Sequence, residues 1–244
     1  MSAGGVRIDA ERFFKRLSLL ETHWSENKDA WGGSDALCIP LGPSGEGLEY
    51  SKSSSLHLFL MGYEFPDTVM VITKGKFFFM ATAKKLKYFE ESVLPAMNEN
   101  TQQVVLLEKT KDDGQNRENM NDLINRMREN KGKKVASFFK ATFEGKFIPQ
   151  WMTMLKDSQL DMHEAGPAFG HFFAQKDSDE LEFCKRAAIL TNKVMKHGFV
   201  TKMEEILDSD GKITHEKVSN DVDEIISNPE KINIKISSDS VDSC

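Results

Sequence analysis

The sequence predicts an α/β fold in which a mixed β-sheet is flanked by helices. Short apolar runs typical of strands alternate along the chain with longer segments in which apolar residues recur at helical spacing. Such alternation indicates a sheet that helices cover on both faces. Two of the apolar runs, 68–73 and 76–82, are separated by a turn at Gly75, whose freedom to adopt a positive φ suits a tight hairpin. This hairpin makes the expected sheet mixed rather than purely parallel.

The expected elements follow one another in a regular order. Asp9 can cap a first helix whose apolar residues lie on one face. A short buried strand is expected over 36–41, and then a helix over 52–63, which Gly62 is placed to end. After the hairpin, helices and strands are expected to alternate: a helix over 84–97, a strand over 103–107, a helix over 117–130, a strand over 134–139 and a helix over 145–158.

A domain boundary is expected near 165–177, where glycines, a proline and a charged cluster interrupt the pattern. The chain is therefore divided into a first domain over 1–175 and a second part over 176–244. At the start of the second part, Asp177 and Glu180 have the spacing of a capping box, which predicts the beginning of a long helix.

Two helices and a strand are expected in the second part. The long helix is expected to bury a seam formed by Leu181, Cys184, Ala188 and Met195. A second helix begins at Thr214, and its apolar face consists of Val218, Val222, Ile225 and Ile226. The chain closes with an expected strand over 232–236.

The composition is that of a globular protein. Of the 244 residues, 39% are hydrophobic and 29% are charged, and no apolar run approaches the roughly 18 residues of a membrane span. Three scattered cysteines offer neither a disulfide framework nor a zinc site. The net charge of −6 arises almost entirely from Met203 onward, where 11 residues are acidic and 4 basic, compared with 27 and 28 in residues 1–202. We interpret this acidic end as a solvated helix surface, with attraction for basic partners as the alternative.

No sequence motif indicates catalysis or cofactor binding. The stretch GPSGEG (42–47) lacks the Lys-Ser/Thr pair of a phosphate-binding loop, and Ser34 lacks the flanking glycine of a nucleophile elbow. The six histidines show no metal-ligand spacing. The basic clusters AKKLKYF and NKGKKV occur in a domain close to neutral, without the interleaved aromatics of a nucleic-acid groove. We therefore predict no catalytic residue, no metal and no cofactor.

The loop GYEFPDT (62–68) precedes the hairpin and is the candidate binding site. Gly62 and Pro66 are expected mainly to set the path of the chain. The side chains expected to face outward are Tyr63, Glu64, Phe65 and Asp67. Aromatic rings and carboxylates together suit a basic, extended peptide segment. We interpret the loop as a structural connector first and a partner contact second.

Three motifs carry a resemblance to a known family: WGGSDA (31–36), GYEFPDT, and FAQKDSDELEFCKRAA (173–188). With them the sequence resembles the amino-terminal lobe of creatinase and aminopeptidase P proteins and, more narrowly, the large subunit of the FACT histone chaperone. The end of the chain, NPEKINIKISSDSVDSC, is similar to that subunit where its second lobe begins. The resemblance implies that residues 1–175 form a complete creatinase-like lobe, and that 176–244 are the incomplete beginning of an aminopeptidase-like "pita-bread" lobe.

The resemblance also implies a function. It suggests a non-catalytic histone- or peptide-binding module that acts on nucleosomes in transcription and replication, in the nucleus and on chromatin. The implied partners are core histones, an HMG-box small subunit bound through regions outside this chain, and the transcription and replication machinery. Neither a membrane nor direct sequence-specific DNA binding is expected.

Two alternatives remain at this stage. The chain could be the amino-terminal part of an aminopeptidase P-like metallopeptidase whose metal-binding residues lie beyond residue 244. It could also be an α/β interaction domain unrelated to chromatin.

Overall fold

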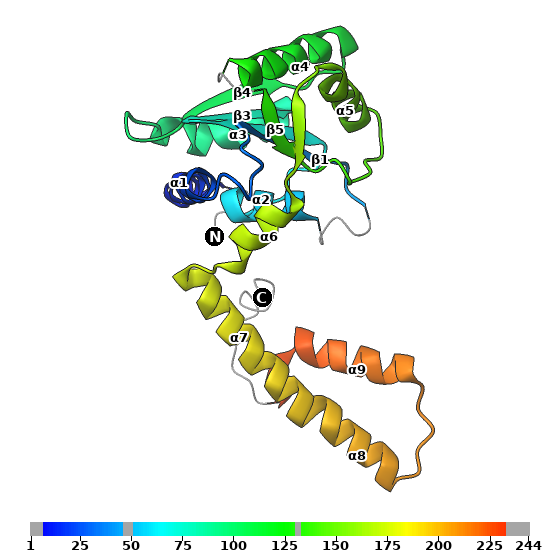
Figure 1. The fold of residues 1–244 in the computed structure, drawn as a ribbon. Helices are drawn as coiled ribbons and strands as arrows, with labels where there is room; N and C mark the ends of the chain where they lie inside the picture. The colour runs from blue at the N-terminus through cyan, green and yellow to red at the C-terminus, as the bar shows by residue number, and fades with distance from the viewer. Residues whose placement is uncertain (1–6, 46–50, 130–132, 233–244) are drawn as a thin grey trace. The chain divides into compact units, whose positions relative to one another are not determined.

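The computed structural model describes residues 7–45, 51–129 and 133–232 (Figure 1). The chain forms two compact units. Residues 1–174 make up the first, which we call the α/β unit, and residues 175–244 the second, which we call the helical unit.

A six-stranded mixed sheet forms the centre of the α/β unit, which confirms the expected fold class. Its strands lie in the order β4-β3-β2-β1-β5-β6. In chain order the strands are β1 (Ala36–Leu41), β2 (Thr68–Thr73), β3 (Lys76–Ala81), β4 (Gln103–Glu108), β5 (Lys134–Ser137) and β6 (Asp161–Glu164).

Only β2 runs against the other strands of this sheet. It pairs in antiparallel fashion with β1 and with β3, in a register that places Ala36 opposite Thr73 and Val69 opposite Met80. The pairs β3–β4, β1–β5 and β5–β6 are parallel. The carboxyl ends of five strands therefore lie at one edge of the sheet, together with the amino end of β2.

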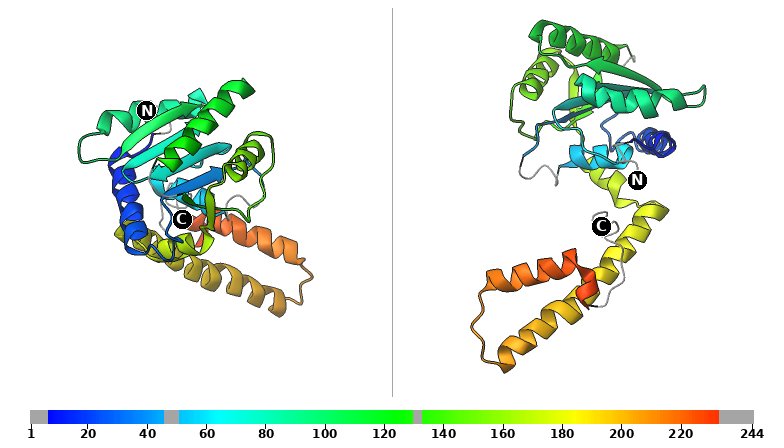
Figure 2. Two further views of the ribbon diagram at one scale, coloured as in Figure 1. Left: turned by 45° about the horizontal axis from the view of Figure 1, so that its top comes forward. Right: turned by 180° about the vertical axis from the view of Figure 1, so that it is seen from behind.

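Helices cover both faces of the sheet, as the views in Figure 1 and Figure 2 show. One core layer lies under α1 (Ala10–Glu26), α2 (Lys52–Met61), α3 (Ala83–Ser92) and α6 (Gly166–Ala174). The other layer lies under α4 (Asp113–Arg128) and α5 (Phe147–Asp157). Along β1 the side chains of Leu37 and Ile39 enter the first layer and that of Cys38 the second, as the two-residue repeat of a strand requires.

Local signals in the sequence explain where α1 begins and where α2 begins and ends. The Asp9 carboxylate accepts a hydrogen bond from the backbone N–H of Arg12 at 3.0 Å, which caps α1. Ser51 caps α2 in the same way, and Gly62 ends α2 in the left-handed conformation with φ of 75°. A short 3₁₀ turn, η2 (Leu94–Ala96), follows α3 and contains the Pro95 that the expected helix over 84–97 would have included.

Strand β6 and helix α6 were not expected from the sequence. The strand has only four residues and no buried side chain, so its apolar pattern is too weak to identify it. Helix α6 lies in the stretch that was interpreted as a boundary because of its glycines and Pro167. Proline is common in the first turn of a helix, however, and Phe169 and Phe172 of α6 are buried in the first core layer.

The helical unit consists of α7 (Ser178–Val194), the π-helical segment η3 (Met195–Val200), α8 (Thr201–Asp208), α9 (His215–Ser227) and the 3₁₀ turn η4 (Pro229–Ile232). The expected capping box at the start of α7 is present. Thr214 caps α9 as expected. Among the residues that the structure describes, no helix has both the length and the apolar character needed to cross a membrane.

The seam expected along the long helix is wrong. Leu181, Cys184, Ala188 and Met195 are all exposed. The side chains of α7 that pack against Val222 and Ile225 of α9 are instead Leu190 and Val194. Only Val218 of the expected apolar face of α9 is buried, and Ile226 is exposed. The expected strand over 232–236 lies, apart from Ile232 in η4, outside the described residues.

Candidate partner-binding site at the carboxyl edge of the sheet

The loop between α2 and β2 lies at the edge of the sheet where five strands end. Its Asp67 N–H donates to the carbonyl of Gly42, which follows β1, at 2.7 Å. Its Asp67 carboxylate pairs with Lys109, which follows β4. In open α/β sheets, ligands bind at the carboxyl ends of the strands. The loop therefore occupies the edge that suits a binding site.

Hydrogen bonds fix the backbone of this loop at several points. The N–H of Phe65 donates to Nδ1 of His57 at 3.2 Å, and Oγ1 of Thr68 donates to the carbonyl of Phe65 at 2.6 Å. The ammonium of Lys85, on α3, donates to the carbonyl of Pro66. Because three elements hold the loop, its connector role is built into the fold.

The expectation that Phe65 faces outward is wrong. Its side chain is only 4% exposed and belongs to the first core layer. The ring packs edge-on against Phe79, with centroids 5.9 Å apart, and also contacts Tyr88 and Phe89. The hydrophobic gain from burying a side chain of this size, about 1.5–3 kcal/mol, outweighs what the ring could gain in an exposed loop. Phe65 therefore anchors the loop to the first core layer.

Asp67 faces an internal partner. It has a positive φ of 58° at the entry to β2, and its carboxylate accepts from the ammonium of Lys109. Lys109 is itself mostly covered and lies over the ring of Phe147, 4.2 Å from the ring centroid. This cation–π contact and ion pair join the loop to the start of α5. Asp67 is thus less available to a partner than the sequence suggested.

His57, beneath the loop, is a structural residue. It is fully buried, and burial together with the charge of Lys85 lowers its pKa to about 3. The ring is neutral at physiological pH and accepts the Phe65 N–H through Nδ1. A ring held neutral inside the core, away from solvent, is unsuited to exchange protons with a ligand.

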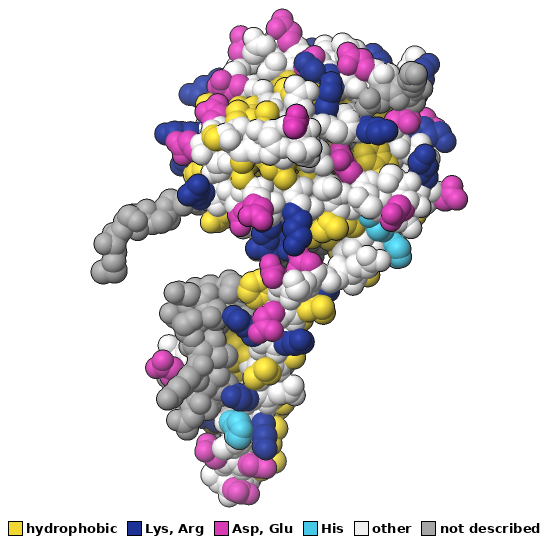
Figure 3. Space-filling model, turned by 90° about the vertical axis from the view of Figure 1, so that its left-hand side faces the viewer, with side chains coloured by type: hydrophobic (Ala, Val, Ile, Leu, Met, Phe, Trp, Pro, Cys, Tyr) yellow, Lys and Arg dark blue, Asp and Glu magenta, His cyan; other side chains and the backbone are white. Residues whose placement is uncertain are grey.

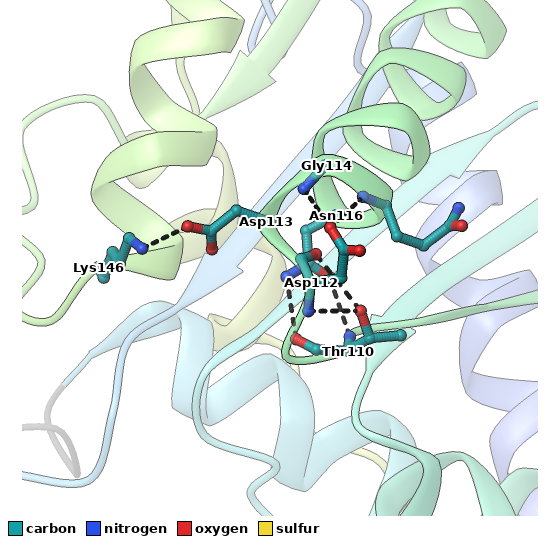
Figure 4. A network of polar contacts seen from close by, with 7 residues as sticks. Thr110, Asp112, Asp113, Gly114, Asn116 and Lys146 are labelled. Atoms are coloured by element: carbon teal, nitrogen blue, oxygen red, sulfur yellow. Dashed lines mark hydrogen bonds and ion pairs between the residues drawn. The ribbon is translucent and has the colours of Figure 1, made fainter.

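A small groove of about 220 Å³ lies beside Asp67, and its charged side chains form two ion pairs, Asp67 with Lys109 and Asp113 with Lys146. Figure 4 shows the network at the start of α4, where Asp112 accepts from the N–H of Gly114 at 2.7 Å. In the same network Thr110 and Asn116 exchange two hydrogen bonds of 2.9 and 3.0 Å. Lys146 donates to Asp113 at 2.5 Å, and this bond lowers the pKa of the Asp113 carboxyl. The network fastens the β4–α4 loop.

The remaining outward side chains of the loop are those of Tyr63 and Glu64. Tyr63 is 39% exposed and Glu64 is half-buried. Neither side chain forms a hydrogen bond or ion pair within the described ranges. Of the four residues named from the sequence, these two remain free to contact another molecule. Lys85 and Lys109, which hold the loop, had no signal in the sequence that linked them to it.

The histidines are dispersed, with one exception that the sequence did not indicate. Nε2 of His23 lies 3.1 Å from Nδ1 of His171, and the indole N–H of Trp31 donates to Nδ1 of His23 at 3.2 Å. Burial and the neighbouring His171 lower the pKa of His23. Across the described part of the chain, no group of three or more His, Cys, Asp or Glu side chains is placed to hold a metal ion.

The fold of this chain is also found in a proline-specific peptidase. The Xaa-Pro dipeptidase of Bacillus anthracis superposes with a TM-score of 0.52 over 85% of this chain and 47% of its own, at 12% identity, which shows a shared fold alone.

The family of this chain is narrower than this shared fold. Residues 8–166 match the family described as "FACT complex subunit SPT16 N-terminal lobe domain", and the chain belongs to this family.

Relatives from plants and fungi support this assignment. The FACT complex subunit SPT16 of Zea mays is 34% identical over 99% of this chain and 23% of its own length. The structure of the N-terminal domain of that subunit from Cicer arietinum (chickpea) has 33% identity and a TM-score of 0.86, covering 95% of this chain and 54% of that structure. The corresponding domain from Eremothecium gossypii has 28% identity and a TM-score of 0.73 over 93% and 52%. This chain therefore spans about a quarter of the length of the curated relatives that it matches.

Proposed function

We propose that this chain is the amino-terminal part of a FACT-type histone chaperone and serves as a non-catalytic module that binds histone segments. The observation that carries the proposal is the family match over residues 8–166, together with similarity to SPT16 subunits along nearly the whole chain. In this proposal the parent protein acts on nucleosomes during transcription and replication, in the nucleus and on chromatin.

The proposed partners extend beyond this chain. Core histones are the ligands, and an HMG-box small subunit of FACT and the transcription and replication machinery bind through other regions. We expect neither membrane association nor direct recognition of a DNA sequence.

We propose further that the chain does not hydrolyse peptides. A metal-activated water needs several carboxylate or imidazole ligands that converge, and the described residues hold no such group. Proline-containing dipeptides and methionyl peptides would be incubated with the chain and added manganese, cobalt or zinc. Turnover that depends on the metal and exceeds that of a heat-inactivated sample would contradict this proposal.

Residues 176–244 are proposed to be the beginning of a pita-bread lobe. Two features support the proposal. The chickpea N-terminal domain is nearly twice as long as the region it shares with this chain. The helices of this unit also leave large apolar side chains exposed, among them Leu181, Ile189 and Leu207.

Tyr63 and Glu64 are the proposed histone contacts. The exposed ring offers a face for a lysine or arginine side chain, and the neighbouring carboxylate offers an ion pair. Phe65 supports them from the core, and Asp67 contributes only if a histone side chain displaces Lys109. An exposed ion pair is worth about 0–1 kcal/mol, so the contact is weak and sensitive to salt.

The double substitution Tyr63→Ala with Glu64→Ala tests this contact in the complete two-lobe domain. We expect core-histone affinity to fall several-fold at low salt and less at moderate salt, with an unchanged circular dichroism spectrum. The matched control is Leu19→Ala with Glu26→Ala, which removes one exposed apolar side chain and one carboxylate from the surface of α1. If the loop variant is folded and binds histones as well as the control does, the loop is only a connector.

A further inference from the structure

A second and larger crevice lies at the same edge of the sheet, between the ends of β1 and β5. It has a volume of about 710 Å³, within the range of about 300–1,000 Å³ that ligand sites occupy. The helix that follows β1 is α2, which covers one face of the sheet, whereas the helix that follows β5 is α5, which covers the other. Such a point, where successive helices leave to opposite faces, is where open α/β sheets bind their ligands.

The amino end of α2 forms one wall of the crevice. Ser51, Lys52 and Ser53 all line it. Ser51 accepts a hydrogen bond from the N–H of Ser54 at 3.0 Å, which leaves the N–H groups of Lys52 and Ser53 without an acceptor inside the helix. The first turn contains no acidic residue, and Lys52 adds an ammonium group to the positive end of the helix dipole.

A serine on this wall also has an unused hydroxyl. Ser53 is only 4% exposed, yet it lines the crevice, and its hydroxyl forms no hydrogen bond with any residue that the structure describes. A ligand that accepts a hydrogen bond from Ser53 would use this free donor.

The acidic residues of the crevice do not cancel this positive wall. One oxygen of Glu164 accepts from the N–H of Phe139 at 2.9 Å and of Lys140 at 3.2 Å, and the other accepts from the N–H of Gly166 at 3.0 Å. Three backbone N–H groups therefore already donate hydrogen bonds to this carboxylate. Glu144, the other acidic residue among the described residues that line the crevice, is exposed.

Apolar side chains complete the crevice. Pro43, Phe138 and Phe143 line it, and Phe138 belongs to the first core layer. The site thus offers a positive wall with unused donors beside a hydrophobic surface.

We propose that this crevice binds an acidic peptide segment, in which a carboxylate or phosphate group accepts from Lys52, Ser53 and the amino end of α2 while a neighbouring apolar side chain packs on Pro43, Phe138 and Phe143. This partner has the opposite charge to a histone segment, so the inference is independent of the proposed histone contact at Tyr63 and Glu64.

Three blocked tripeptides test the proposal by titration into the chain, followed through its backbone amide NMR signals. Each has leucine on both sides of a central residue, which is aspartate, phosphoserine or asparagine. We expect the two acidic peptides to shift the amide signals of residues 52–54 and to bind at least about tenfold more tightly than the asparagine peptide, which corresponds to about 1.4 kcal/mol. Whichever of the two acidic peptides binds more tightly identifies the preferred anion.

Substitutions then distinguish binding in the crevice from non-specific electrostatic attraction. We expect Ser53→Ala to weaken the acidic peptides by about tenfold, because hydrogen bonds to charged groups are the stronger ones. Lys52→Gln should weaken them by a few-fold at low salt, because Lys52 is exposed and an exposed ion pair contributes less. Ser54→Ala is the matched control, because Ser54 is a fully buried neighbouring serine whose hydroxyl also lacks a partner among the described residues but which does not line the crevice.

The proposal is overturned if no peptide binds at millimolar concentration, if all three bind equally, or if the Ser53 and Lys52 variants bind as the Ser54 control does. Lys52 is exposed, so Lys52→Gln is expected to fold even if Ser53→Ala does not.

Discussion

The two units of this chain bury their apolar side chains to very different extents. The α/β unit fills a layer on each face of its sheet, and many of its aromatic and aliphatic side chains are wholly buried. In the helical unit, the core between α7 and α9 consists of Leu190, Val194, Val222 and Ile225. Figure 3 shows hydrophobic side chains on the surface of the helical unit, interspersed with charged ones.

The difference indicates that the units depend on different parts of the protein for stability. Burial of a large apolar side chain contributes about 1.5–3 kcal/mol, and the α/β unit has enough of these side chains to hold the carboxyl edge of its sheet rigidly. The helical unit has too few among its described residues. Its stability is therefore expected to depend on contacts outside the described residues or with another molecule.

Truncation of one leucine in each unit should give the largest contrast. Leu37 of β1 is fully buried, whereas Leu207 of α8 is 73% exposed. We expect Leu37→Ala to lower the free energy of unfolding of the α/β unit by about 2–5 kcal/mol, because it leaves a cavity. Leu207→Ala should change stability by less than about 0.5 kcal/mol. Urea unfolding measures both, and similar effects of the two substitutions would show that the units are packed alike.

Substitution of one glycine in each unit should give the next largest difference in stability. Gly32 has a φ of 64°, and an added Cβ would lie 2.3 Å from the ring of His163. We expect Gly32→Ala to cost about 3 kcal/mol, from the left-handed backbone and the clash together. Gly198 lies in η3, where the nearest atom to an added Cβ would be the flexible end of Ile225, at 3.0 Å, and the next atoms lie at ordinary contact distances. For Gly198→Ala the gain in helix propensity offsets the crowding, so the change in unfolding free energy should stay within about 1 kcal/mol. A large loss for Gly198→Ala would mean that α7 and α9 are packed as rigidly as the sheet.

The stability of the α/β unit should fall on acidification. The folded-state pKa of His57 is lowered from 6.5 to about 3, so below pH 6.5 the unfolded chain takes up a proton that the folded chain does not. From pH 6.5 to 5 this linkage should remove about 1.5 kcal/mol. The lowered pKa of His23 acts in the same direction.

Substitution of His57 isolates its share of this pH dependence. His57→Asn keeps an acceptor for the Phe65 N–H and removes the titrating ring, so its unfolding free energy should depend less steeply on pH than that of the parent. The parent chain, measured in the same buffers, is the reference. An unchanged slope in His57→Asn would show that His57 does not remain neutral in the folded chain.

A helix cap should have the smallest effect. The side chain of Asp177 accepts from the N–H of Glu180 at 2.9 Å, and the Glu180 carboxylate accepts from the N–H of Asp177 at 3.0 Å. Asp177→Ala should cost the helical unit about 1 kcal/mol and leave the α/β unit unchanged, whereas Asp177→Ser should retain most of the cap. Thermal unfolding followed by circular dichroism measures the effect on the transition of the helical unit. Equal losses of stability in the two variants would contradict this expectation.

The sequence predicted the parts of the fold that depend on strong local patterns. The apolar runs gave β1, β2 and β3 with their bounds almost unchanged, and Gly62 and Asp177 marked a helix end and a helix start. Short or polar elements such as β6 carry no such pattern, because pairing with a neighbouring strand, and not apolar alternation, defines them.

The sequence predicted the loop before β2 but not the contacts of its side chains. The loop was found from its aromatic and acidic residues, but the burial of Phe65 depends on Phe79 and Phe89, which lie in elements further along the chain. Likewise, the pairing of Asp67 with Lys109 follows from the order of strands in the sheet. Contacts between residues distant in sequence are not visible in local spacing, and for this reason Ser53 and Lys52 were also missed.

Hydrogen exchange of the backbone amides in the monomeric chain tests the contrast between the two units most directly. We predict much slower exchange across residues 68–81, which form β2 and β3 in the middle of the sheet, than across residues 215–227 of α9. Light scattering on the same sample would confirm that no second copy covers the helical unit. Equal protection of the two segments in a monomer would contradict the account, because it would show that the helical unit is as stable as the α/β unit without any further chain.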